Sequence, residues 1–111
     1  MKKILTATII SLSLTSSAFA GVCGGATCTQ VKITEIMATS WGSILIGTDA
    51  DESLLDCTAY SGKYTYVANS AIGKNAQYSA LLTAKTTNTP IRVDFVADAQ
   101  GICQIAYVRI Q

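Results

Sequence analysis

Histidine is absent from this 111-residue chain, and its absence removes several kinds of chemistry at once. The chain has no imidazole to serve as a general base, as a metal ligand or as part of a serine or cysteine triad. It also lacks a Gly-x-Ser-x-Gly elbow, a phosphate-binding loop and a dinucleotide-binding fingerprint. Carboxylate pairs such as Asp49 with Asp51, or Asp94 with Asp98, are expected to be solvated. The sequence therefore predicts a protein that is not an enzyme and that binds no cofactor or metal.

Charged residues are scarce, at 14% of the chain, and the formal net charge is +1. The lysines and arginines are scattered rather than clustered. Removal of Lys2 and Lys3 with the leader described below takes the net charge from +1 to −1. A nucleic-acid-binding surface needs clustered basic residues, and attachment to an anionic membrane needs a polybasic run. We therefore expect neither among the partners of this protein.

The N-terminal segment has the pattern of an export signal. Met1 to Lys3 is basic, residues 4–14 are mostly apolar, and Ala18-Phe19-Ala20 is a small-x-small cleavage site before Gly21. The apolar run is too short, and wrongly flanked, for a membrane-spanning helix. We expect a signal peptide over residues 1–20, one small domain over residues 21–111, and a location in the periplasm or outside the cell.

All four cysteines follow the leader, and an even number in an exported chain predicts two disulfides. Four cysteines allow three pairings. The short spacing from Cys23 to Cys28 favours a local bridge, which leaves Cys57 to pair with Cys103. In the chain-entropy model the local bridge contributes about 2 kcal/mol and the long one about 4 kcal/mol. A four-cysteine zinc site is the alternative, but the paired C-x2-C knuckles typical of such sites are missing.

Apolar alternation predicts strands on both sides of a single helix. Within the first strand the apolar phase changes at Glu35, which predicts a bulge or a sharp bend. Residues 21–30 have no period and are expected to form an irregular arm, and the acidic residues 49–52 a solvated turn. The predicted elements are strands at 31–38, 43–48 and 53–60, extended structure over 64–68, a helix from residue 75, and strands at 91–97 and 102–110, the last two joined by a hairpin loop at 98–101.

The predicted helix carries its large side chains on one stripe. Tyr78, Leu81, Leu82 and Lys85 follow the helical spacing, and Asn75 is the expected N-cap. Three strands, a helix and two strands are the order of a small OB-fold barrel. The third and fifth strands of such a barrel are neighbours, which suits the long disulfide. We therefore expect a mainly β, five-stranded, OB-fold-like barrel that is stapled by disulfides.

Three segments of the chain are similar to a known family. VKIT-E at residues 31–35, DCT at 56–58 and YSALLTAKTTNTPIRV at 78–93 resemble the subtilase cytotoxin B subunits, which belong to the pertussis-like pentameric toxin B subunit family. The resemblance extends over about Val31 to Val96. It implies a ring of five copies that binds cell-surface glycans and carries a separate catalytic A subunit.

The resemblance also implies positions for a sialic-acid pocket. A serine of that pocket corresponds to Thr29, which keeps a hydroxyl group. An aspartate corresponds to the region of Gly25, and a tyrosine corresponds to Phe95, which lacks the phenol oxygen. Two of the three polar contacts of that pocket are therefore absent from this chain.

Aromatic side chains are the other candidates for ligand contacts, because they can act as platforms for sugar rings. We single out Trp41, Tyr60 and Tyr64, and the alternative is that these side chains cap the barrel. Two functions are open: a toxin-B-like protein that binds a glycan or protein receptor, or a lone periplasmic OB-fold protein of the envelope with a structural or stress-related role. A third is an inhibitor that acts through the loop at residues 48–53.

Overall fold

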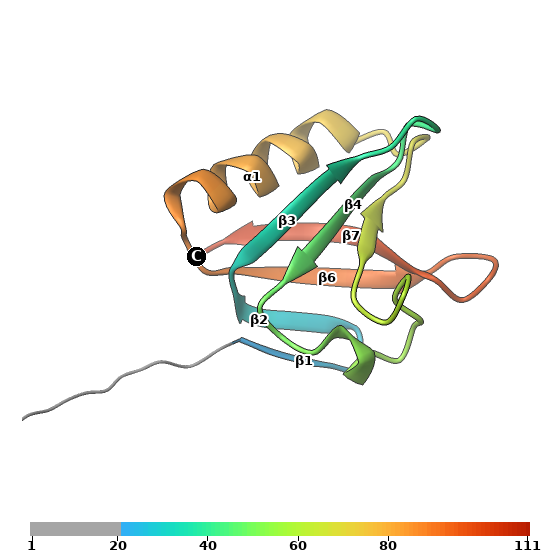
Figure 1. Ribbon diagram of the computed structural model, residues 1–111, viewed down its shortest axis with the longest axis horizontal. Helices are drawn as coiled ribbons and strands as arrows, with labels where there is room; N and C mark the ends of the chain where they lie inside the picture. Colours follow the sequence, from blue (N-terminus) through green and yellow to red (C-terminus); the bar gives the residue numbers. More distant parts are fainter. Residues whose placement is uncertain (1–20) are drawn as a thin grey trace, which may run out of the picture.

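The computed structural model describes residues 21–111, so the predicted signal peptide lies outside the described residues. The fold is mainly β with one α-helix, as the sequence predicts (Figure 1). In sequence order its elements are β1 (Val22–Gly24), β2 (Thr27–Val31), β3 (Ile33–Ala38), β4 (Ile44–Thr48), the 3-10 helix η1 (Glu52–Leu54), β5 (Thr65–Val67), α1 (Lys74–Thr87), β6 (Ile91–Ala97) and β7 (Cys103–Ile110).

The strands form one seven-stranded sheet with the order β1-β2-β6-β7-β5-β4-β3. Neighbouring strands are antiparallel except for β5 and β7, which are parallel. β2 and β3 are consecutive in the chain but distant in the sheet order, so the sheet curls into a half-barrel (Figure 1). The structure therefore has more strands than the five that the sequence predicts.

The predicted first strand, residues 31–38, is interrupted at Lys32, which separates β2 from β3. Gln30 has a φ of 55°, and Lys32 belongs to neither strand. The backbone N–H of Lys32 donates to the Asp49 carboxylate at 3.0 Å, and its carbonyl accepts from the Asp49 N–H at 3.1 Å. A register shift between Ile33 and Glu35 explains the change of apolar phase.

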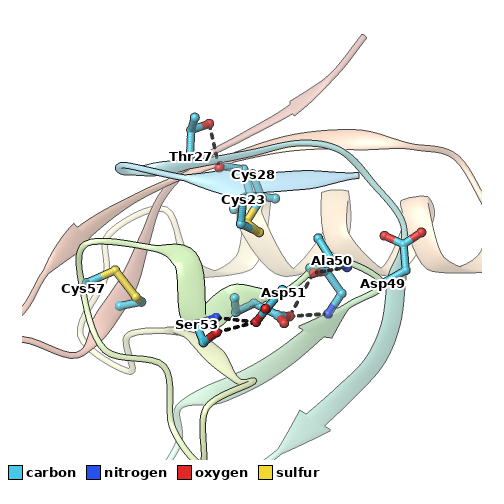
Figure 2. Close-up of a disulfide and its surroundings, with 12 residues drawn as sticks. Cys23, Thr27, Cys28, Asp49, Ala50, Asp51, Ser53 and Cys57 are labelled. Atoms are coloured by element: carbon cyan, nitrogen blue, oxygen red, sulfur yellow. Dashed lines mark hydrogen bonds between the residues drawn. A yellow bond between two sulfur atoms is a disulfide. The ribbon is translucent and has the colours of Figure 1, made fainter. Parts of the chain in front are cut away.

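The N-terminal arm is a regular β-hairpin rather than the irregular segment predicted from sequence. β1 pairs with β2 so that Cys23 lies directly opposite Cys28, and the two form a disulfide (Figure 2). Gly25 supplies the turn with a φ of 59°. Periodicity failed here because the strands are too short to show it.

The predicted third strand over residues 53–60 is wrong. Asp51 instead begins η1, since its carboxylate accepts from the Ser53 N–H at 3.1 Å (Figure 2). Residues beyond η1 make only isolated bridges, at Leu55, Thr58 and Tyr60. The sole strand in this region is β5, within the extended stretch predicted at residues 64–68.

The acidic turn is only partly solvated, because Glu52 is 3% exposed. Its carboxylate accepts from the Thr48 N–H at 2.7 Å and from the Thr48 hydroxyl at 2.9 Å. Two hydrogen bonds of this kind offset much of the cost of burying the carboxylate. Glu52 therefore fixes the chain as it leaves β4. The sequence does not predict this role, because Glu52 stands among other acidic residues that are expected to be solvated.

The helix α1 begins one residue earlier than predicted, and its buried face matches the predicted stripe only in part, since Tyr78 and Leu81 pack on the core. Asn75 lies inside the helix and is not its N-cap. Leu81 and Ala84 are buried, whereas Leu82 is 42% exposed and Lys85 is exposed. Ala84, which is 1% exposed, takes the place in the core that the sequence predicts for Leu82.

β6 confirms its predicted alternation, and it supplies much of the core. Ile91, Val93 and Phe95 are at most 3% exposed, while Arg92 and Asp94 face outward. The hairpin loop predicted at residues 98–101 is also present, between β6 and β7. A second disulfide joins Cys57 to Cys103 at the start of β7. Both bridges have the pairing that the cysteine spacing predicts.

Candidate ligand-binding pocket

An open pocket of about 380 Å³ lies on the outer face of the sheet beside β3 and β4. That volume is within the range of small-molecule sites. Its lining is aromatic and apolar apart from one serine, and consists of Met37, Trp41, Leu45, Tyr60, Ser61 and Tyr64. The structure thus brings Trp41 together with two further predicted site residues, Tyr60 and Tyr64, which lie about twenty positions later in the sequence.

Strand pairing builds the floor of the pocket. Met37 on β3 lies opposite Leu45 on β4, and Leu45 lies opposite Tyr66 on β5. Because side chains alternate along a strand, the three project from the same outer face. Met37 is 36% exposed, whereas Leu45 and Tyr66 are each 9% exposed. Met37 and Leu45 thus form an apolar floor, and Tyr66 continues the row outside the pocket lining.

Trp41 stands at the turn between β3 and β4 and is 65% exposed. The next residue, Gly42, has a φ of 92°, a conformation that favours glycine. A Cβ atom at Gly42 would lie 2.4 Å from Oδ1 of Asn69, so the turn also packs too closely for a side chain there. Backbone geometry and packing therefore both fix the turn that carries Trp41.

Tyr60, Ser61 and Tyr64 enter the pocket from a tight loop. The N–H of Tyr60 donates to the carbonyl of Tyr64 at 2.8 Å, and the N–H of Tyr64 donates back at 2.9 Å. Ser61 and Gly62 complete the reversal with φ angles of 52° and 75°. This paired loop holds the two tyrosines on neighbouring positions at the pocket wall.

Charged groups lie at the rim of the pocket. The Tyr64 hydroxyl donates to Oε1 of Glu35 at 3.0 Å, and Nζ of Lys63 lies 5.0 Å from the Tyr64 ring centroid. The Tyr64 ring passes beside Gly47, where an added Cβ would lie 3.7 Å from it. Such a distance is an ordinary van der Waals contact. Tyr64 thus passes over Gly47 on β4 to reach Glu35 on β3.

Tyr66 on β5 lies next to the pocket and contacts Tyr60, one of its lining residues. Its ring centroid lies 5.8 Å from that of Tyr60. Its hydroxyl donates to Oδ2 of Asp98 at 2.5 Å, while Oδ1 of Asp98 accepts from the N–H groups of Gln100 and Ile102. Burial, together with the bond to Asp98, raises the pKa of Tyr66 well above its usual range. The β6–β7 loop is thereby tied to β5.

This link predicts a dependence of stability on pH. The hydrogen bond from Tyr66 and those from backbone N–H groups hold the pKa of Asp98 below its usual value. The carboxylate therefore stabilises the fold above the unfolded pKa of about 3.9, and the contribution is lost as pH falls through the lower folded pKa.

We expect Asp98→Asn to make the acid side of the thermal-stability profile shallower, with Asp56→Asn as the control. Asp56 is exposed, and its side chain makes no hydrogen bond within residues 21–111. Thermal unfolding from pH 2 to pH 6 measures the effect. A profile of Asp98→Asn parallel to that of the parent protein would contradict it.

Two of the positions taken from the toxin resemblance, Thr29 and Phe95, lie outside the pocket. Thr29 is half-buried on β2, and Phe95 is 3% exposed within the core. Neither lines the aromatic pocket. Sequence reasoning missed Met37, Leu45 and Ser61, although the change of phase in β3, which turns Met37 outward, was a usable signal.

The described residues also lack clustered metal ligands, membrane-spanning helices and free thiols. Within residues 21–111 no group of three histidine, cysteine, aspartate or glutamate residues could hold a metal ion. No helix in the same range is long and apolar enough to cross a membrane. Two disulfides with no free thiol suit an oxidising, extracellular or periplasmic environment. Comparison of the chain with protein-family models, curated proteins and solved structures finds no match.

Proposed function

We propose that this protein is an exported, non-catalytic binding protein that holds a glycan in the aromatic pocket. One observation carries the proposal: Trp41 from the β3–β4 turn and the two tyrosines of the 60–64 loop, Tyr60 and Tyr64, converge on one open pocket. Exposed aromatic rings in a concave site offer flat apolar surfaces with polar edges. Those surfaces are complementary to the C–H faces of sugar rings.

The polar groups at the pocket also suit a sugar. Ser61 is exposed in the lining, and Tyr64 and Glu35 present a hydroxyl and a carboxylate beside it. These groups can exchange hydrogen bonds with sugar hydroxyls. The lining itself carries no charge, so the ligand part that enters is expected to be neutral.

The topology supports an OB-fold-like interpretation. If β2 and β3 are counted as one bent strand, the sheet order is that strand, then β4, β5, β7 and β6, with β6 paired back to β2. OB-folds bind oligosaccharides on the face of their second and third strands, next to the first loop. The pocket has the corresponding place, beside β4 and the turn that carries Trp41. This support is by analogy of fold.

The toxin-B-like function extends this proposal to a ring of five copies, a cell-surface receptor and a catalytic partner chain. The alternative is a lone periplasmic envelope protein with a structural or stress-related role. Light scattering on the oxidised protein separates them. A five-fold mass favours the toxin-B-like assembly, whereas a monomer favours the lone protein.

We expect Trp41→Ala and Tyr60→Ala each to weaken glycan binding at least tenfold, about 1.4 kcal/mol, because each removes an aromatic wall of the pocket. The measurement is binding to an array of neutral and acidic oligosaccharides, followed by calorimetry on the best one. Leu82→Ala is the control, since Leu82 is 42% exposed on α1 and lies outside the pocket. Unchanged binding by a folded Tyr60→Ala protein would remove the proposed site.

A further inference from the structure

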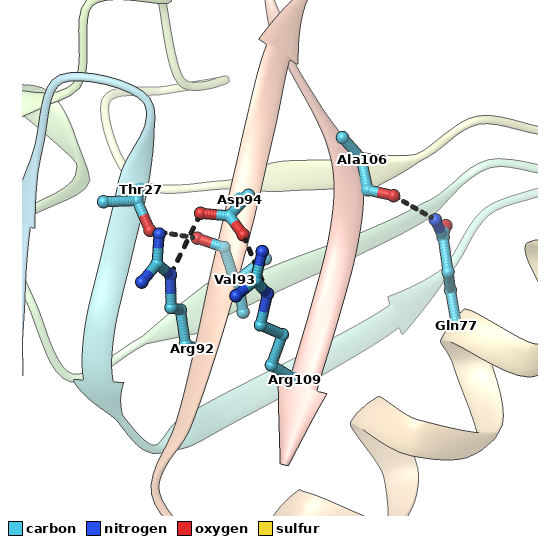
Figure 3. Close-up of polar contacts among 7 residues, drawn as sticks. All are labelled: Thr27, Gln77, Arg92, Val93, Asp94, Ala106 and Arg109. Carbon is cyan, nitrogen blue, oxygen red and sulfur yellow. Dashed lines mark hydrogen bonds and ion pairs between the residues drawn. The ribbon is translucent and has the colours of Figure 1, made fainter. Parts of the chain in front are cut away.

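The chain has two arginines, Arg92 and Arg109, and the fold places them directly opposite each other on β6 and β7. Like charges at directly opposed positions of neighbouring strands repel each other. Nε of Arg92 lies 3.2 Å from Oδ1 of Asp94, and Nε of Arg109 lies 3.5 Å from Oδ2 (Figure 3). One carboxylate thus faces two guanidinium groups, and the cluster keeps a net charge of one positive unit.

A β-bulge creates this arrangement. The register of β6 and β7 shifts between Asp94 and Phe95, so that Ala106 has no partner on β6. Without the extra residue Arg92 would face Val108, and Arg109 would turn to the inner face of the sheet. Bulges often re-aim a side chain in this way next to functional sites.

The bulge is supported by the helix. Nε2 of Gln77 on α1 donates to the carbonyl of Ala106 at 3.1 Å (Figure 3). A side chain of the helix therefore provides a hydrogen bond to the backbone at the bulge. A surface ion pair made only for stability contributes little, about 1 kcal/mol or less, and needs no such bulge.

The donors of the cluster are only partly used. The hydrogen bond within the cluster runs through Nε of Arg92, and within residues 21–111 the Nη groups of the two arginines donate no hydrogen bond. The Arg92 and Arg109 side chains are 35% and 54% exposed, so these groups are open to solvent. Planar guanidinium forks match the oxygens of carboxylate, sulfate and phosphate groups.

We propose that Arg92 and Arg109 form a binding site for an oxyanion, a sulfate or carboxylate group, and that Asp94 is a positioning residue that holds the two guanidinium groups side by side. Tyr107, opposite Asp94 in the register, presents an exposed ring and hydroxyl beside the site. The anion is either a free ion or a group carried by an acidic sugar. This site is independent of the aromatic pocket, whose lining includes no residue of β6 or β7.

Titration of the oxidised protein with sodium sulfate, against sodium chloride at equal ionic strength, tests the proposal. Because the chain has two arginines, nitrogen NMR gives two Nε signals to follow. We expect both signals to move and to saturate with sulfate but not with chloride. Arg109→Gln should weaken sulfate binding at least tenfold, and Arg109→Lys should weaken it less, because lysine keeps the charge but loses the fork.

Lys85→Gln is the control, since it removes one exposed positive charge from the helix. Its sulfate binding should stay within twofold of the parent protein. Equal weakening by Lys85→Gln and Arg109→Gln, or a sulfate response that matches chloride, would overturn the site. A second titration with galactose 6-sulfate identifies the source: tighter binding than sulfate indicates a sugar-borne group, and equal binding indicates a free ion.

Discussion

Replacement of Cys57 and Cys103 by serine is expected to lower the free energy of unfolding by about 4 kcal/mol and to abolish binding at the aromatic pocket. The bridge closes a loop with a sequence separation of 46, so its loss frees a long stretch of the unfolded chain. For a domain of this size the loss is comparable with a large part of the net stability.

The effect on the pocket has a local cause. Residues 55–64 contain no strand and only isolated bridges, and they carry Tyr60, Ser61 and Tyr64. The disulfide holds this segment against β7, together with two 2.8 Å hydrogen bonds that the backbone of Thr58 makes with Gly101 and Cys103. Without the disulfide, only these two hydrogen bonds hold the segment against β7, and we expect the pocket wall to lose its fixed position.

Urea unfolding and glycan calorimetry on the same samples measure both effects. The matched control is the pair Cys23→Ser and Cys28→Ser, which opens a loop with a separation of 5. That change should cost about 2 kcal/mol and leave the pocket intact. Full glycan affinity in the folded Cys57→Ser, Cys103→Ser protein would refute the positioning role.

Phe95→Ala is expected to lower the free energy of unfolding by about 3 to 5 kcal/mol. Phe95 is 3% exposed and packs in the core with Val93 and Ile105, so alanine leaves a cavity that the sheet cannot close. The toxin resemblance implies a ligand contact at this position instead. A surface contact of that kind would give a stable protein with impaired binding.

Urea unfolding measures the stability of Phe95→Ala, and Phe95→Leu is the conservative control, expected to cost less than about 1.5 kcal/mol. Glycan affinity of the folded Phe95→Leu protein should equal that of the parent protein. A Phe95→Ala protein that is stable but has lost its glycan affinity would contradict the core role and indicate that Phe95 contacts the ligand.

Several features follow from the sequence alone because their causes are local. The alternation of Ile91, Val93 and Phe95 predicts a half-buried strand, and the turn residues at 98–101 predict the hairpin that follows. The short spacing of Cys23 and Cys28 favours their own bridge and, by elimination, the long one. The absence of histidine and the scarcity of charge are likewise read from the sequence alone.

Tertiary structure decided the rest, because periodicity reports which residues are buried but not what they pack against. Residues 53–60, predicted as the third strand, instead follow the buried Glu52 carboxylate and are joined to β7 by the long disulfide. Packing on the sheet buries Ala84 rather than Leu82 on the helix.

The two proposed sites also depend on tertiary structure. Trp41, Tyr60 and Tyr64 are recognisable in the sequence as aromatic residues, yet their meeting in one pocket depends on non-local strand pairing. The arginine pair depends on a single extra residue in β7, which reverses the face of every position after it.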